Sequence, residues 1–122
     1  MSRFIFVGEC RSITAVNRGW TWRDGHLAAK PLFEALEAMG VDPAAQRFLN
    51  LFRDPPHAVY YNAASVARLR AANDQTIVAM GQRQHYGLEA LGIAHRTIVH
   101  PAARGRIRKR ERYVAHVAEV LS

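Results

Sequence analysis

Several features common in other classes of protein are scarce or missing from this sequence of 122 residues. Its single cysteine, Cys10, excludes an internal disulfide framework and any zinc or iron–sulfur site built from cysteines alone. No apolar run approaches the roughly eighteen residues of a membrane span, and residues 1–7 do not resemble a signal peptide. We therefore expect one cytoplasmic domain over residues 1–122, with no membrane partner.

Lysine and acidic residues are also scarce relative to arginine. The chain has 17 Lys+Arg against 10 Asp+Glu, a formal net charge of +7, and 15 of the 17 basic residues are Arg. The planar Arg guanidinium matches phosphate oxygens, and a basic domain attracts nucleic acid by releasing counterions. The charge therefore favours a polyanionic partner such as nucleic acid, and a nucleoid-associated location is expected if that partner is DNA. A high-GC genome, which also favours Arg codons, is the alternative explanation.

Apolar runs alternate with segments of helical spacing along the chain. Buried strands are predicted over residues 4–8, 47–52, 76–80 and 96–99. Helices are predicted over residues 28–39, 63–72, 82–91 and 107–121. Residues 9–27 have no clear period and are expected to form a long loop, and residues 57–62 a short extended segment. This alternation predicts an α/β fold, a three-layer α/β/α sandwich with a central four-stranded parallel sheet.

Polar residues follow the predicted strands at their carboxyl ends, where parallel α/β sheets bind ligands. Glu9 can position a water or stabilise a developing cation there, and a solvated loop acid is the alternative. Asn50 interrupts an apolar run, and its amide suits either the edge of a base or a neighbouring backbone turn. His100 can donate to a developing oxyanion or exchange a proton, although a lone histidine is more often structural.

The remaining histidines and the tryptophans give weaker indications. The six histidines include no pair at metal-ligand spacing, so no metal site is expected. Trp20 and Trp22 lie in the aperiodic segment beside Arg18 and Arg23. Their rings can stack on a base or cover the core under the loop, and the sequence leaves both possibilities open.

A basic segment follows His100 and continues into the last predicted helix. Its six basic residues are Arg104, Arg106, Arg108, Lys109, Arg110 and Arg112. They crowd the expected helix N-terminus, where the helix dipole disfavours cations and a phosphate would relieve the repulsion. The segment therefore predicts contact with the DNA backbone, with a solvated helix face as the alternative.

Four short motifs at the predicted strand ends resemble, in their order and spacing, the motifs of the uracil-DNA glycosylase superfamily. Residues 6–9 (FVGE) look like its first motif, and residues 48–50 (FLN) resemble its second strand, whose terminal Asn binds the uracil edge. Residues 76–81 (TIVAMG) resemble its third strand, and residues 97–102 (TIVHPA) its His-Pro-Ser motif. The sequence departs from the pattern at residues 10–12 (CRS), where the family has Pro-Gly, and at Ala102, where it has Ser.

This resemblance implies an enzyme that flips a pyrimidine out of DNA and hydrolyses its N-glycosidic bond without a cofactor. The residues that it implies for catalysis are Glu9 and His100, and those for base binding are Gly8, Asn50 and, as a stacking aromatic, Trp22. Those that it implies for DNA binding are Arg104, Arg106, Arg108, Lys109 and Arg110, with Ile107 as a wedge between bases. Two alternatives stay open: a non-catalytic DNA-binding relative, and a small enzyme acting on free nucleotides or nucleosides.

Overall fold

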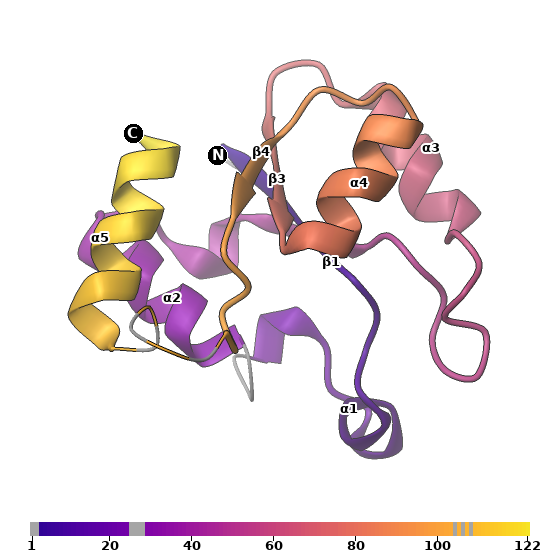
Figure 1. Cartoon of the computed structure of the whole chain (residues 1–122), viewed down its shortest axis with the longest axis horizontal. Coiled ribbons are helices and arrows are strands. Elements are labelled where there is room, and N and C mark those ends of the chain that lie inside the picture. The colour runs from indigo at the N-terminus through magenta and orange to yellow at the C-terminus, as the bar shows by residue number, and fades with distance from the viewer. Residues whose placement is uncertain (1–2, 25–28, 104, 106, 108) are drawn as a thin grey trace.

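The computed structural model has one sheet of four parallel strands at its centre (Figure 1). It describes residues 3–24, 29–103, 105, 107 and 109–122. The strands are β1 (Phe4–Gly8), β2 (Arg47–Asn50), β3 (Thr76–Met80) and β4 (Arg96–Ile98). They are ordered β2-β1-β3-β4, and every neighbouring pair is parallel. The predicted α/β sandwich around a four-stranded parallel sheet is confirmed.

Helices cover both faces of this sheet. They are α1 (Ile13–Arg18), α2 (Ala29–Ala38), α3 (Ala63–Ala71), α4 (Gln82–Ala90) and α5 (Arg110–Leu121), with short 3₁₀ helices η1 (Trp22–Asp24) and η2 (Pro43–Ala45). Figure 1 shows α2 and α5 on one face and α3 and α4 on the other, while α1 lies beyond the carboxyl end of β1. No helix in the described part of the chain is long and apolar enough to cross a bilayer.

The central position of β1 in the sheet explains why its sequence is apolar without interruption. Phe4 and Phe6 face the layer of α2 and α5, whereas Ile5 and Val7 face the layer of α3 and α4. Because alternate side chains of a strand point to opposite faces, a strand covered on both sides needs apolar residues at every position. All five residues of β1 are buried accordingly.

The predicted loop over residues 9–27 is wrong for its first half, which contains α1. The Ser12 hydroxyl accepts a hydrogen bond from the Ala15 N–H at 3.1 Å and caps the helix. Gly19, with a φ of 69°, ends it. None of its six residues is buried, so α1 has no apolar stripe that periodicity could detect.

Three other segments differ from the prediction by two residues or more. Residues 57–60 form turns rather than an extended segment, because the His57 N–H donates to the Asp54 carbonyl and the Tyr60 N–H donates to the His57 carbonyl. Strand β2 ends at Asn50, two residues earlier than predicted. Helix α5 begins at Arg110 rather than residue 107, because Lys109 has an extended backbone (φ −63°, ψ 132°).

Candidate functional site

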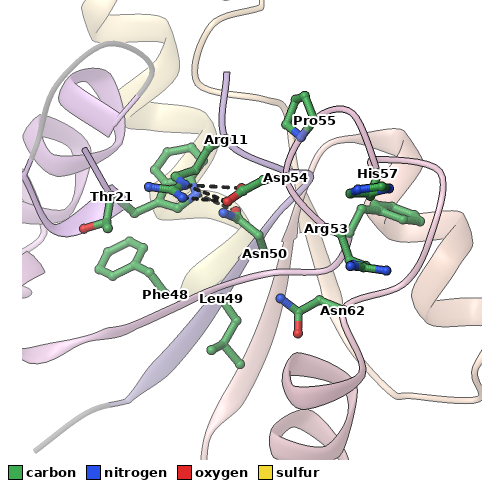
Figure 2. Close-up of a pocket in the computed structure, with 12 residues that line it drawn as sticks. Arg11, Thr21, Phe48, Leu49, Asn50, Arg53, Asp54, Pro55, His57 and Asn62 are labelled. Carbon is green, nitrogen blue, oxygen red and sulfur yellow. Dashed lines mark hydrogen bonds and ion pairs between the residues drawn. The ribbon is translucent and has the colours of Figure 1, made fainter. Parts of the chain in front are cut away.

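Two adjacent clefts lie at the carboxyl ends of the strands. The first cleft, of about 620 Å³, includes Phe48, Asn50, Arg53, Asp54, His57 and Asn62 in its lining (Figure 2). The second cleft, of about 450 Å³, includes Glu9, Cys10, Trp20, His100 and Ala102. Arg11, Thr21 and Trp22 line both clefts and form the wall between them. The structure thus brings Glu9, Trp22, Asn50 and His100, which are distant in the sequence, to one end of the sheet.

The order of the strands explains why the clefts form at this end. The connection after β1 runs through α2 on one face of the sheet, and the connection after β3 runs through α4 on the other. Loops that leave neighbouring strands in opposite directions open a crevice between them. Glu9, which follows β1, and Arg83, in the first turn of α4 after β3, span this point with an ion pair of 2.7 Å.

Gly8, Trp22 and Asn50 form a close three-residue contact. The indole Nε1–H of Trp22 donates a hydrogen bond to Asn50 Oδ1 at 2.9 Å. A β-carbon on Gly8 would lie 2.6 Å from both of these atoms, so only glycine fits beneath them. The Trp22 ring also packs nearly parallel to Phe48, at 13° and 6.4 Å between centroids. Trp22 therefore covers the core and faces both clefts at once.

The half-buried amide of Asn50 has one side engaged and the other free within the described residues. Its oxygen accepts from Trp22, and its nitrogen has no hydrogen-bond partner there. An amide offers two N–H donors beside its acceptor, so the free side can donate to a carbonyl of a bound molecule. Asn50 therefore combines a donor for a ligand with an acceptor that an indole already occupies.

Arg83 fixes the carboxylate of Glu9. One guanidinium nitrogen donates to Glu9 Oε1 at 2.7 Å, and another donates to the Ala58 carbonyl at 2.7 Å. The guanidinium carbon lies 3.6 Å above the centroid of the Phe52 ring, a cation–π contact.

Cys10 is the residue after Glu9. Burial and the Glu9 carboxylate raise the pKa of the Cys10 thiol, so that thiol is a poor nucleophile.

His100 is held as a neutral hydrogen-bond donor. Its Nδ1 accepts a hydrogen bond from the Ala102 N–H at 3.0 Å, which leaves the proton of the neutral ring on Nε2. Burial lowers the pKa of His100 below its ordinary value, and the nearby Glu9 carboxylate opposes that shift. The ring therefore offers an uncharged N–H donor near neutral pH.

Helix α5 fixes the backbone directly before His100. The Tyr113 hydroxyl donates to the Val99 carbonyl at 2.9 Å, and the Val99 N–H donates to His116 Nε2 at 2.9 Å. Val99 lies just beyond the end of β4, an edge strand, so α5 side chains satisfy both of its backbone groups. Burial raises the pKa of Tyr113, which keeps its hydroxyl protonated as the donor.

Arg11 and Asp54 form the ion pair at the centre of the first cleft (Figure 2). A guanidinium nitrogen lies 2.6 Å from Asp54 Oδ2, and Nε lies 3.2 Å from both carboxylate oxygens. The hydrogen bonds lower the pKa of Asp54 and raise that of Arg11. Sequence reasoning missed both residues, because 43 positions separate them and no motif links them. It also missed Arg83, although the neighbouring strand end at residues 81–82 signalled its location.

Histidines that are not adjacent in sequence also come together away from the clefts. His85 Nδ1 lies 2.8 Å from His95 Nε2, and His85 Nε2 lies 3.3 Å from a Glu89 oxygen. The spacing of the histidines in the sequence did not predict this pair, because His85 lies in α4 and His95 in the segment before β4. Glu89 approaches the opposite side of the ring from His95, and among the described residues no three metal-ligating side chains converge.

The basic segment after His100 is described only in part. Arg104, Arg106 and Arg108 lie outside the described residues. Lys109 is the N-cap of α5, and Arg110 pairs with Glu34 of α2 at 3.1 Å; neither lines a cleft. Ile107 is partly buried against the core on the α2 and α5 face, which argues against its expected role as a wedge between bases.

Comparison with known sequences assigns no family to this chain. Neither a scan against protein-family models nor a search of curated proteins finds a match.

Proposed function

We propose that this chain processes DNA bases by taking a flipped pyrimidine over Gly8 and hydrolysing its N-glycosidic bond. The hydrogen bond from the Trp22 indole to Asn50, directly over Gly8, is the observation that carries the proposal. An indole is a planar heterocycle with a ring N–H, as uracil is. A base that displaced Trp22 would meet the same bare backbone and the same amide oxygen. Displaced from this position, Trp22 would be free to stack on the base face.

Glu9 and His100 line the second cleft and have the chemistry that bond cleavage requires. As the bond between C1′ and the base breaks, its electron pair leaves with the base and negative charge develops on a base carbonyl. The neutral His100 Nε2–H stabilises that charge by donating to the carbonyl. The Glu9 carboxylate stabilises the cationic sugar and orients the water whose oxygen adds to C1′. The water gives up a proton, and the departing base takes one up.

The charges of the site favour a polyanionic substrate. Glu9 and Asp54 are acidic residues of the cleft linings, and each is paired with an arginine, Arg83 and Arg11. These pairs reduce the repulsion between the clefts and a phosphate backbone. The net charge of +7 adds a long-range attraction to DNA that depends on ionic strength. The basic segment from Arg104 to Arg110 remains our proposed backbone contact.

A non-catalytic DNA-binding protein is the second candidate, and two observations favour it. One oxygen of the Glu9 carboxylate is already engaged by Arg83, and Trp22 fills the position proposed for the substrate. Under this alternative, Asn50 and the arginines would bind a nucleotide without cleaving it.

A glycosylase assay separates the two candidates. Oligonucleotides that contain uracil or another altered pyrimidine are incubated with the protein, and free base is measured by chromatography. We expect base release that Glu9→Gln and His100→Ala abolish while DNA binding persists. Glu37→Gln, an exposed carboxylate on α2, is the matched control and should leave release unchanged.

Each candidate function predicts a different result in these assays. Binding without release of any base would leave the non-catalytic alternative. Affinity that does not grow with oligonucleotide length would favour an enzyme of free nucleotides. Loss of DNA binding in Glu9→Gln or His100→Ala would contradict the catalytic roles given to these residues.

A further inference from the structure

Three of the four tyrosines of the chain have exposed side chains, and they lie on two elements that contact each other, the β2–α3 loop and α4. Tyr60 is 59% exposed, Tyr61 is 41% exposed and Tyr86 is 63% exposed, whereas Tyr113 is buried in the core. Large aromatic rings usually lose most of their exposure on folding because burial is favourable. We call the surface formed by Tyr60, Tyr61 and Tyr86 the tyrosine platform.

Contacts between the β2–α3 loop and α4 place Tyr61 against the helix that carries Tyr86. The Ala58 carbonyl of the loop accepts a hydrogen bond from Arg83 of α4 at 2.7 Å. The Tyr61 ring lies 3.5 Å from where a β-carbon of Gly87 would be, and Tyr86 is the residue before that glycine. Figure 1 shows this loop projecting below α3, on the side of the sheet that also carries α4. The platform therefore spans two elements that are far apart in sequence.

The platform is continuous with the first cleft. The Arg53 N–H donates to the Tyr60 carbonyl at 3.0 Å, and Arg53 lines the cleft. Tyr61 stacks on Phe52, another residue of the cleft lining, with 5.2 Å between centroids and 19° between planes. A chain lying across the platform would therefore lead directly into the cleft.

The charges around the platform identify the class of partner. The cations Arg53 and Arg83 border it, and Glu9 and Asp54, the carboxylates of the cleft linings, are paired with arginines. On α4, Glu89 lies against His85. Val59 is the only exposed aliphatic side chain in the loop. Rings with polar tips between cationic side chains favour stacked bases and phosphates over an apolar protein surface.

We propose that the tyrosine platform binds single-stranded nucleic acid by stacking bases on Tyr60 and Tyr86, and that this strand leads into the first cleft. The link to the cleft rests on the proposed function and deepens it, because stacking on the platform selects single-stranded over duplex substrate. In a duplex the base faces are already stacked on one another and cannot meet the tyrosines.

Fluorescence anisotropy with a labelled thymine 15-mer and a duplex of equal length tests the platform. The wild-type protein should bind the single strand more tightly. Tyr60→Ala/Tyr86→Ala should weaken single-strand binding about tenfold or more, with the salt dependence unchanged, because stacking releases no counterions. Tyr60→Phe/Tyr86→Phe keeps both rings and should bind within twofold of wild type. Tyr61 is left intact because its ring packs on Phe52.

Arg53→Gln provides the complementary electrostatic control. It should lower single-strand affinity and also reduce the slope of log K against log salt by about one. Circular dichroism checks that every variant remains folded. Because the thymine oligomer contains no uracil, this binding is measured independently of excision. Absence of excision with intact binding would contradict the proposed function alone.

Four results would contradict the proposal that the tyrosine platform binds single-stranded nucleic acid. They are an absence of wild-type binding to the thymine oligomer, equal or tighter binding to the duplex, unchanged affinity in the double alanine variant, and failure of the phenylalanine variant to bind normally. Sedimentation supplies one more test. A wild-type dimer that the alanine variant dissociates would show that a second copy of the chain occupies this surface instead.

Discussion

The indole N–H of Trp22 donates a hydrogen bond of 2.9 Å to the side-chain oxygen of Asn50. A bound base would need this acceptor, so the indole competes with it. Trp22→Phe keeps an aromatic ring near Phe48 but removes the indole N–H donor together with the ring that carries it. We expect the variant to bind free uracil about two to ten times more tightly, the range for one hydrogen bond. Titration monitored by calorimetry measures this, with Trp20→Phe as the control. Weaker binding in Trp22→Phe would show that the indole supports the base instead.

Arg83→Gln should separate orientation of the Glu9 carboxylate from substrate binding. Arg83 holds Glu9 at 2.7 Å and is fixed by the Ala58 carbonyl and the Phe52 ring. Without it, Glu9 samples other rotamers, and kcat for base release should fall about tenfold while KM changes little. Steady-state kinetics test this, with Arg68→Gln on the exposed side of α3 as the charge control. Equal kcat values for both variants would exclude a positioning role for Arg83.

The sheet and the location of the clefts could be predicted because each depends on a local pattern. Uninterrupted apolar runs identify β1 and β3, since both faces of these central strands are covered. Parallel strands end at one edge, so Glu9, Asn50 and His100 were expected there together. Their roles in chemistry remain predictions that the fold does not test.

What could not be predicted depends on long-range contacts or on elements without buried residues. The pairs Arg11–Asp54 and Glu9–Arg83 join residues 43 and 74 positions apart, and no local pattern marks their partners. Helix α1 depends on its Ser12 cap rather than on an apolar face. The exposure of Tyr60 and Tyr86 is a property of the folded surface, because tyrosine fits a core equally well in a sequence pattern.

Base release should depend on pH through His100. Its folded pKa lies below the ordinary value of 6.5, because burial disfavours the cation. The neutral donor therefore predominates at pH 7, and kcat/KM should be level above about pH 6.5 and fall as the pH drops through the lowered pKa. A pH–rate profile combined with an NMR titration of the His100 ring checks this. A rate that rises as the pH falls would identify the imidazolium as the active form.

Asp54 should make stability sensitive to acid. Its pKa is lowered by Arg11, so the unfolded state binds more protons as the pH falls below about 5. The stabilisation is complete above the unfolded pKa and is lost as the pH falls through the folded pKa. Both side chains are partly exposed, so we expect about 1 kcal/mol or less. Urea unfolding of wild type and Asp54→Asn should differ at pH 7 and converge near pH 2.

Asp74→Asn is the control for this titration, since Asp74 forms no ion pair within the described residues. It should leave the difference between pH 7 and pH 2 as in wild type. An Asp54→Asn variant with the pH dependence of wild type would mean that the ion pair with Arg11 adds nothing to folding.

His116 should act on catalysis through the backbone that precedes His100. It accepts a hydrogen bond from the Val99 N–H at 2.9 Å, and β4, which ends at Ile98, is an edge strand of the sheet in the described part of the chain. His116→Ala leaves the N–H without this partner, so stability should fall by about 1 kcal/mol and kcat several-fold, with KM unchanged. His116→Gln can still accept through its side-chain oxygen and should recover most of kcat. Because only the alanine variant loosens the backbone, its His100 ring resonances should shift while those of the glutamine variant stay near wild type. Identical kcat values in wild type and both variants would show that Tyr113 and the packing of α5 fix Val99 without His116.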